Sequence, residues 1–193
     1  MYGLLHSWLA SLPVKSWVQR RLGPGVYAWY RLFFNLIGVL TFLPLLALVR
    51  LLPDQPLYQI PFPWSILAVL VQLSGAAVVV AGVLQTGLLA FLGLDMLTGR
   101  DPAGPPRLVT GGLYRLIRHP LYAGGLLFLW ASPVMTTNLL AFDLGGSLYL
   151  IIGALFEERK LLGEFGAEYA EYRRRTPMLV PGLTRGKKDI QSH

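Results

Sequence analysis

Two clusters of charged and polar residues stand at the ends of two long apolar segments, and their residue types could bind a ligand. The first is Arg-His-Pro-Leu-Tyr at residues 118–122, where an apolar segment begins. The second is the pair Glu157 and Glu158, where the next apolar segment ends. Charged residues beside such segments are costly and often mark a functional site. These clusters are therefore the candidate site of the chain.

The proline at position 120 predicts that a helix begins directly after His119. A residue before proline is disfavoured from helical conformation, whereas proline is favoured as the first residue of a helix. We expect His119 to be the N-cap and Pro120 the first helical residue. The first turn would then offer unpaired N–H groups and the positive end of the helix dipole. An anion is expected there, held also by Arg118 and His119.

Further residues near the first cluster suit a ligand that approaches the backbone closely. Gly111 and Gly112 permit such an approach, and Tyr114 and Tyr122 supply aromatic rings with polar ends. The glutamate pair supplies the opposite charge. A ligand with a carboxylate at one end and a cationic centre at the other would match both clusters. S-adenosylmethionine is such a molecule, because it has an α-carboxylate, an α-ammonium and a sulfonium.

The composition indicates a membrane protein. Of 193 residues, 54% are hydrophobic and only 14% are charged, and the mean hydropathy is +0.52, which does not describe an ordinary soluble domain. The absence of cysteine excludes disulfides, thiolate metal sites and cysteine nucleophiles, and we expect no metal site. The net charge of +7 comes from basic residues that flank apolar segments. That placement favours contact with a cytoplasmic membrane surface over nucleic acid.

About four apolar spans predict an all-α, polytopic transmembrane helical bundle that forms one membrane domain over residues 1–193. Residues 1–24 predict an interfacial amphipathic helix, and residues 27–92 contain the first two spans. Residues 93–182 contain a polar loop, a helical hairpin and a C-terminal cytoplasmic helix. Residues 183–193 form a basic tail that would lie on anionic lipid. The positive-inside rule places the loop, the candidate site and both termini on the cytoplasmic side.

The third and fourth spans are expected to form a symmetric hairpin. The midpoint of positions 119 and 157 is Asn138, which lies in a polar turn. Each arm of about 19 residues would be roughly 28 Å long. His119 and Glu157 should then lie at the same depth, near the cytoplasmic boundary. The fourth helix is expected to continue beyond Glu158 through residues 161–172 with an apolar stripe.

The residues around both clusters resemble the isoprenylcysteine carboxyl methyltransferase family and similar phospholipid methyltransferase-like membrane enzymes. The resemblance rests on Leu-Val-Thr-Gly-Gly-Leu-Tyr-Arg-Leu-Ile-Arg-His-Pro-Leu-Tyr at residues 108–122, on the two glutamates, and on Phe-Gly-Ala-Glu-Tyr-Ala-Glu-Tyr at residues 165–172. It covers roughly residues 93–182. Arg-His-Pro-x-Tyr alone has little specificity. Its combination with paired glutamates at hairpin distance and with the tyrosine-rich ending is fairly specific.

The resemblance implies a membrane enzyme that binds S-adenosylmethionine from the cytoplasm, methylates a lipophilic or small acceptor and releases S-adenosylhomocysteine. Carried over by position, the cofactor-binding residues are Gly112, Tyr114, His119, Pro120, Tyr122 and Glu158. Arg118 and Glu157 are expected near the acceptor, as the catalytic residues. A carboxylate acceptor could be positioned by Arg118. An amine or thiol acceptor requires a base, for which Glu157 is the candidate.

The sequence leaves the acceptor and two other functions open. The expected partners are an acceptor from the bilayer and membrane lipids, with no nucleic acid and no obligate protein partner. A membrane reductase of the sterol or steroid type would have a similar helical core and a related Arg-His-x-x-Tyr region, but would use NADPH. A non-enzymatic scaffold would use the clusters as a partner contact. In a purely structural role, Arg118 would mark the cytoplasmic side, and the glutamates would only neutralise nearby cations.

Overall fold

The structure is a computed structural model, and it describes residues 2–94 and 107–182 of the chain. The central part of the predicted polar loop (residues 95–106) and the predicted basic tail (residues 183–193) lie outside the described residues. The described elements are mainly α-helices, as predicted, and they divide into two compact units. Of the described residues, the first unit contains residues 2–59, 86–94 and 134–145, and the second contains residues 60–85, 107–133 and 146–182.

Three helices in the described part of the chain are long and apolar enough to cross a bilayer. They are Gly25–Leu51, Trp64–Thr86 and Thr137–Phe165, and a shorter apolar helix covers Pro120–Trp130. The shorter helix has 11 residues, or roughly 16 Å at 1.5 Å per residue, about half of a hydrocarbon core. The prediction of two helical hairpin arms of equal length is therefore wrong, because only the first part of the third span is helical.

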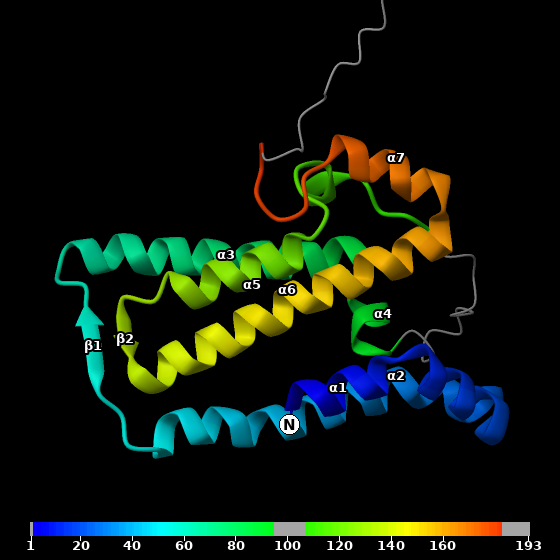
Figure 1. Ribbon diagram of the computed structural model, residues 1–193, viewed down its shortest axis with the longest axis horizontal. Coiled ribbons are helices and arrows are strands. Elements are labelled where there is room, and N and C mark those ends of the chain that lie inside the picture. The colour runs from blue at the N-terminus through cyan, green and yellow to red at the C-terminus, as the bar shows by residue number, and fades with distance from the viewer. Residues whose placement is uncertain (1, 95–106, 183–193) are drawn as a thin grey trace, which may run out of the picture. The chain divides into compact units, whose positions relative to one another are not determined.

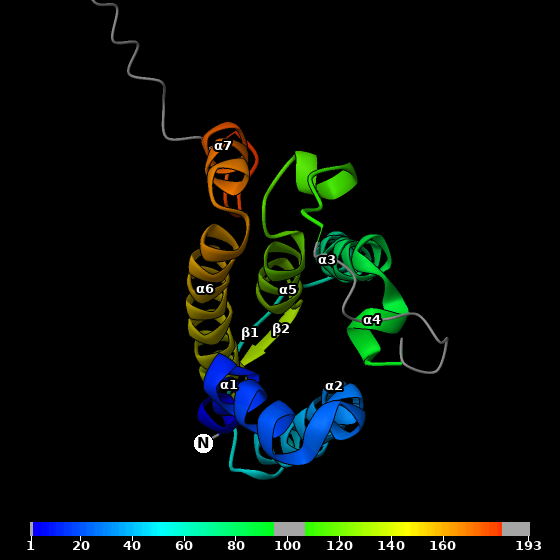
Figure 2. The same ribbon diagram turned by 90° about the vertical axis from the view of Figure 1, so that its right-hand side faces the viewer.

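The first unit begins with two helices that lie side by side (Figures 1 and 2). α1 (Tyr2–Ala10) is followed by α2 (Leu12–Leu51), which starts after Ser11 as N-cap with a proline in its first turn. Within α2, Gly23 has a non-helical backbone with φ 83, a conformation that glycine tolerates. The segment predicted as one interfacial helix, residues 1–24, is thus divided between α1 and the part of α2 before the kink.

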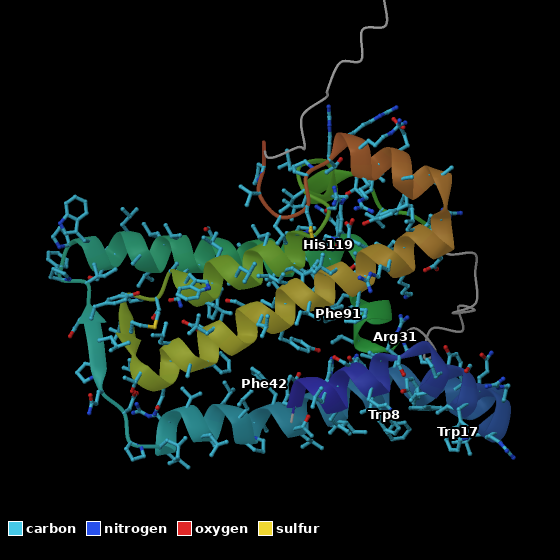
Figure 3. The ribbon with its side chains drawn as sticks, viewed as in Figure 1. Trp8, Trp17, Arg31, Phe42, Phe91 and His119 are labelled. Atoms are coloured by element: carbon cyan, nitrogen blue, oxygen red, sulfur yellow. The ribbon has the colours of Figure 1, made fainter. Side chains whose placement is uncertain are left out.

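α1 packs lengthwise against the apolar part of α2. The Tyr30 hydroxyl donates a hydrogen bond to the carbonyl oxygen of Leu9 at 2.5 Å, and the ring centroids of His6 and Phe34 lie 4.3 Å apart. The indole of Trp8, by contrast, is exposed, at 61% (Figure 3). One face of α1 therefore contacts a helix long enough to span a membrane, and the other face remains available to solvent or lipid.

Two short strands form an antiparallel pair that the sequence pattern does not predict. β1 (Pro56–Gln59) pairs with β2 (Val134–Thr136), with Tyr58 opposite Met135. Strands of three or four residues are too short for a recognisable alternation of apolar and polar side chains. Pro133 stands directly before β2, and a proline disfavours helical conformation in the residue that precedes it. This explains why the helix before β2 stops short of a full span.

Polar side chains around Asn138 tie the start of α6 (Thr137–Phe165) to the end of α2. Oδ1 of Asp54 accepts hydrogen bonds from the Thr137 hydroxyl and the Asn138 N–H, both at 2.9 Å. The Asn138 amide in turn donates to two carbonyls at the end of α2, at 3.1 and 3.2 Å. The predicted polar turn thus satisfies unpaired backbone groups at both helix ends.

In the second unit, α5 (Pro120–Trp130) lies between α3 (Trp64–Thr86) and the later part of α6 (Figures 1 and 2). A Cβ on Gly75 of α3 would lie 2.7 Å from the carbonyl oxygen of Gly124 of α5. The two backbones therefore approach closely only because both residues are glycine. This contact fixes α5, and with it the start of the helix after His119, against a long apolar helix.

Glycines interrupt two helices that the sequence predicts as continuous. The second predicted span ends early, because Gly87 (φ 98) separates α3 from a short helix, α4 (Leu88–Leu92). The predicted continuation of the fourth helix is correct as far as Phe165 and wrong beyond it, because Gly166 (φ 54) separates α6 from α7 (Ala167–Arg175). Only glycine adopts such positive φ values readily. The break at Gly166 lets α7 leave the axis of α6 and return toward the start of α5.

Candidate functional site

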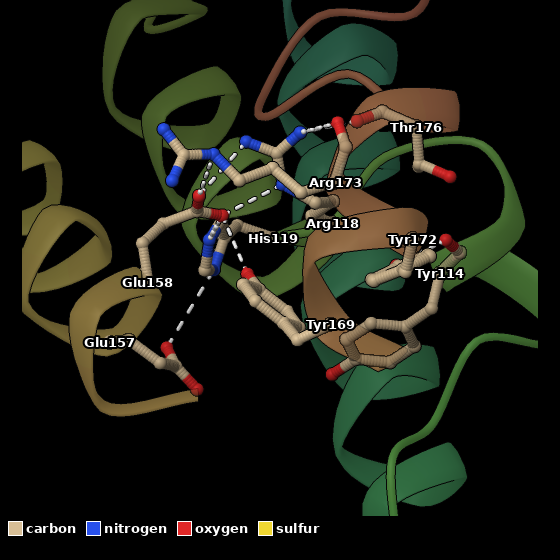
Figure 4. Close-up of polar contacts among 9 residues, drawn as sticks. All are labelled: Tyr114, Arg118, His119, Glu157, Glu158, Tyr169, Tyr172, Arg173 and Thr176. Atoms are coloured by element: carbon tan, nitrogen blue, oxygen red, sulfur yellow. Dashed lines mark hydrogen bonds and ion pairs between the residues drawn. The ribbon is translucent and has the colours of Figure 1, made fainter. Parts of the chain in front are cut away.

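The two charged clusters meet at the start of α5 (Figure 4). His119 is the N-cap residue of α5 and Pro120 stands in its first turn, as predicted. The imidazole of His119 contacts both glutamates of α6. Its Nδ1 is 3.7 Å from Oε2 of Glu157, and its Nε2 is 2.9 Å from Oε1 of Glu158. The predicted proximity of His119 and Glu157 is therefore confirmed.

The Glu158 carboxylate is buried and accepts hydrogen bonds from several side chains. In addition to His119, its Oε1 accepts from Nε of Arg118 at 2.7 Å and from the Tyr169 hydroxyl at 2.6 Å. Its Oε2 accepts from Nη2 of Arg118 at 3.1 Å and lies 3.3 Å from Nε of Arg173. Because a carboxylate has about four acceptor positions, Glu158 has little capacity left for a ligand.

The guanidinium group of Arg118 forms hydrogen bonds with other groups of the protein. Two of its nitrogens bind the Glu158 carboxylate, and Nη1 donates to the carbonyl oxygens of Arg173, at 3.1 Å, and of Thr176. The side chain is only 9% exposed. In this arrangement Arg118, which the sequence places near the acceptor, joins the start of α5 to α6 and to the end of α7.

Glu157 differs from its neighbour because it is partly open to the surroundings. Its side chain is 42% exposed, against 8% for Glu158. Besides its contact with His119, it interacts electrostatically with the nearby Tyr122 side chain. These two contacts orient the Glu157 carboxylate while leaving part of it accessible. Glu157 is therefore the acidic group of this site that can meet a ligand.

A C-terminal strap, residues 176–178, pairs with the backbone in front of α5. The N–H of Arg118 donates to the carbonyl oxygen of Pro177 at 2.9 Å, and the N–H of His119 donates to that of Met178 at 3.1 Å. These bonds fix the backbone of the residues that carry the first cluster. The sequence does not predict this pairing, since residues 176–178 have no local pattern that indicates it.

Two tyrosines of α7 face the site, where the sequence predicts an apolar stripe. Tyr169 is fully buried, and its hydroxyl donates to Glu158. The Tyr172 hydroxyl donates to the carbonyl oxygen of Tyr114 at 2.5 Å. Of the predicted stripe, Tyr169 and Tyr172 therefore face inward, whereas Leu162 is 39% exposed. The tyrosines also act as hydrogen-bond donors, which an apolar stripe does not predict.

The predicted cofactor residues Gly112 and Tyr114 lie on a short 3-10 helix, η2 (Gly112–Arg115), that precedes α5. Gly112 has φ 58, in the left-handed region that favours glycine. The next residue, Leu113, donates its N–H to Oε1 of Gln85 at 3.1 Å. The η2 segment is thus connected to α3 by Gln85, a residue that sequence reasoning did not single out.

The setting of His119 favours its charged form. Burial alone would lower the pKa of His119, but hydrogen bonds and charge interactions with Glu157 and Glu158 raise the pKa above its ordinary value of about 6.5. Burial, with the nearby charge of Glu157, raises the pKa of Tyr114 to about 12, and burial raises the pKa of Tyr172 to about 12. Both phenols are therefore neutral hydrogen-bond donors at physiological pH.

Replacing His119 with glutamine is expected to flatten the pH dependence of stability on the alkaline side. Since the folded pKa lies above the unfolded value, the histidine stabilises the fold fully below about pH 6.5, and this contribution is lost as pH rises through the folded pKa. The melting temperature of the wild type should therefore fall from pH 6 to 9 more steeply than that of His119→Gln, as measured by thermal unfolding in detergent.

His6→Gln is the matched control for this measurement. Burial lowers the pKa of His6, so its contribution to stability is lost as pH falls and not as pH rises. The control should keep the alkaline fall of the wild type. An equally steep alkaline fall in His119→Gln would contradict the assignment of a charged His119.

The structure groups the predicted site residues around the start of α5 and on η2. Around α5 lie Arg118, His119, Pro120, Tyr122, Glu157 and Glu158, and on η2 lie Gly112 and Tyr114. The residues that sequence reasoning missed are Gln85, Tyr169, Tyr172, Arg173 and the strap. Within residues 2–94 and 107–182, no group of three or more His, Asp or Glu side chains is placed to hold a metal ion.

Comparisons with known proteins point to methyltransferases. Methanethiol S-methyltransferase 1 of Bradyrhizobium diazoefficiens is 31% identical over 188 residues, which cover 94% of this chain and 64% of that protein. Methanethiol S-methyltransferase 2 of the same organism is 54% identical over 71 residues, covering 37% of this chain and 27% of that protein. Protein-S-isoprenylcysteine O-methyltransferase B of Arabidopsis thaliana is 36% identical over 78 residues, 39% of this chain and 40% of that protein.

A family model matches a part of the chain that includes both charged clusters. The chain spans less than two thirds of the length of each of these three relatives, and no significant match is found among solved structures. The family model described as phospholipid methyltransferase matches residues 64–168, more than half of the 193-residue chain. It covers α3, α5, α6 and the start of α7, the elements that build the site. The chain therefore belongs to the phospholipid methyltransferase family.

Proposed function

We propose that this protein is a multi-pass integral membrane methyltransferase that transfers a methyl group from S-adenosylmethionine to a small thiol. Two relatives that align with 94% of the chain at 31% identity are named methanethiol S-methyltransferase 1 and methanethiol S-methyltransferase. Three helices long and apolar enough to span a bilayer support the membrane location. The reductase and scaffold alternatives have no such support from the comparisons.

The charges around α5 fit S-adenosylmethionine. Glu157 offers a partly exposed carboxylate that suits the sulfonium end, where the acceptor must also approach. The first turn of α5 offers backbone N–H groups that lack helical partners and that suit the carboxylate end. Gly111 leaves open space on the η2 side, since a Cβ there would meet no atom within 4 Å. Gly112, Tyr114, His119, Pro120 and Tyr122 form the wall that we assign to the cofactor.

Arg118 is buried and Glu157 is partly exposed, and this difference indicates which kind of acceptor the site can take. A carboxylate acceptor would need a free cation, but Arg118 is buried and already bound to Glu158 and to two carbonyls. A thiol acceptor would need a base, and Glu157 is an accessible carboxylate. We therefore assign Arg118 and Glu158 to positioning and Glu157 to proton transfer. The geometry favours an acceptor that must lose a proton.

The proposed reaction needs a base, an aligned acceptor and a charged methyl donor. Bound S-adenosylmethionine would supply a methyl group on a positively charged sulfur. Glu157 would take the proton of the thiol, and the thiol sulfur would form the new carbon–sulfur bond as the methyl group leaves the sulfonium. The products are a thioether, S-adenosylhomocysteine and a protonated Glu157. Base catalysis of this kind contributes about 10²- to 10⁴-fold in rate, and alignment of the two substrates contributes further.

We place the site, the N-terminus and the C-terminus on the cytoplasmic side. Basic residues near η2 and α7 support this orientation, because positively charged loops stay in the cytoplasm. In this arrangement α5 and the extended segment that includes β2 form the third crossing, and α6 forms the fourth. The whole of residues 1–193 then acts as one membrane domain.

The deciding experiment combines ligand binding with methyl transfer on the detergent-purified protein. We expect a thermal shift with S-adenosylhomocysteine but none with NADP, and transfer of labelled methyl to methanethiol but not to a farnesylcysteine carboxylate. Stabilisation by NADP alone would overturn the proposal in favour of a reductase. Transfer only to the carboxylate would overturn the choice of acceptor.

A further inference from the structure

Gln85 supports the η2 segment from the side of α3. It lies in the last turn of α3, and its Oε1 accepts the N–H of Leu113 at 3.1 Å. Leu113 stands between Gly112 and Tyr114, two residues that we assign to the cofactor wall. The bond joins residues 28 positions apart, so it fixes η2 relative to a helix that packs tightly against α5.

Gly112 is adapted to this contact. A Cβ added at Gly112 would lie 2.6 Å from Nε2 of Gln85 and 2.7 Å from its Oε1. A side chain at position 112 would therefore displace the Gln85 amide and break its bond to Leu113, in addition to straining a residue with φ 58. The backbone at Gly112 thus contacts the side-chain amide of Gln85 directly.

Tyr172 supports the same segment from the side of α7. Its hydroxyl donates to the carbonyl oxygen of Tyr114 at 2.5 Å. Gln85 therefore accepts from the N–H of one η2 residue, while Tyr172 donates to the carbonyl of the next. Because these bonds come from two different helices and meet adjacent residues, they restrict both the position and the orientation of η2.

We propose that Gln85 is a positioning residue for the cofactor, acting through η2, with Tyr172 as its counterpart from α7. This inference rests on the proposed function, because it assumes that η2 lines the cofactor site. Neither side chain takes part in the methyl transfer. Their contribution is to keep the η2 backbone in the geometry that receives the ligand, so that less ordering is needed when the ligand binds.

Gln85→Leu tests the proposal, with Gln85→Glu as the conservative variant. Leucine removes the acceptor for Leu113, whereas glutamate keeps an oxygen at the same place. We expect Gln85→Leu to raise the Kd for S-adenosylhomocysteine and the KM for S-adenosylmethionine about tenfold, in line with loss of one such hydrogen bond and some misplacement. The kcat and the KM for the thiol should change less than about twofold, and Gln85→Glu should restore most of the affinity.

Gln72→Leu is the matched control. Gln72 is also on α3, and its amide donates to the carbonyl oxygen of Phe128 at 3.0 Å, near the end of α5 that lies away from His119. The control therefore loses the same kind of bond between a glutamine and a backbone group, but not one to η2. Its Kd for S-adenosylhomocysteine should equal that of the wild type.

Hydrogen exchange gives a readout that does not depend on turnover. In Gln85→Leu and in Tyr172→Phe, the amides of residues 112–117 should exchange faster than in the wild type, and in Gln72→Leu they should not. Equal Kd values and equal exchange in Gln85→Leu and Gln72→Leu would overturn the inference while leaving the proposed function intact. Failure of the wild type to bind S-adenosylhomocysteine would overturn both.

Discussion

Replacing Glu158 with alanine is expected to lower the free energy of unfolding by about 3–5 kcal/mol, the usual cost of removing one partner from a buried ion pair. The substitution leaves the Arg118 guanidinium and the His119 imidazole without the carboxylate that both now bind. It also leaves the buried Tyr169 hydroxyl without its acceptor. Chemical denaturation of the detergent-purified protein measures the change.

Glu157→Ala is the matched control, because it removes the same side chain one position earlier on α6. Glu157 is 42% exposed and Glu158 is 8% exposed, so the control should lose less than about 1 kcal/mol, as is usual for partly exposed pairs. Equal destabilisation by the two substitutions would show that Glu158 is not the group on which the charged cluster depends.

Replacing Glu157 with glutamine is expected to lower kcat for methyl transfer to a small thiol by about 10²- to 10⁴-fold, the usual contribution of a general base. Glutamine has the shape of glutamate, but it cannot take the proton. Binding of S-adenosylhomocysteine should weaken much less than kcat falls. Single-turnover transfer of labelled methyl, beside calorimetric binding of S-adenosylhomocysteine, separates the two effects.

The acidity of the thiol provides a stringent test of this role. An aromatic thiol that is already ionised at the assay pH needs no base. With this acceptor, the ratio of the wild-type kcat to the kcat of Glu157→Gln should therefore approach one. Glu164→Gln serves as the control, because Glu164 is an exposed glutamate on the same helix and should leave kcat unchanged. An equal loss with ionised and neutral thiols would assign Glu157 to binding instead of proton transfer.

The sequence predicts the meeting of the two clusters because chain reversal at a polar turn is simple geometry. His119, Pro120 and Glu157 are placed correctly by the rules for residues before proline and by equal distance from Asn138. The prediction of two helical arms of equal length, however, is wrong. The two segments between Asn138 and the clusters still bring His119 and Glu157 together, although only α6 is helical throughout.

The parts of the site that the sequence did not predict depend on long-range contacts. Gly166 stands within an otherwise helical pattern, and only its positive φ reveals that α7 turns back to bring Tyr169 to Glu158. The pairing of the strap with Arg118 and His119 uses backbone atoms, which every residue has, so no side-chain pattern indicates it. The bond from Leu113 to Gln85 is of the same kind.

The position of Arg118 between distant segments has a consequence for how the protein is made. Arg118 leaves the ribosome 40 residues before Glu158 and 58 residues before Thr176, or roughly 3–12 s before the latter at normal rates of synthesis. During this interval it is a cation at the flank of a nascent apolar segment, the kind of charge that directs membrane topology. The same side chain is thus available first as a topogenic signal and later, once Glu158 and the strap have been translated, as part of the finished site.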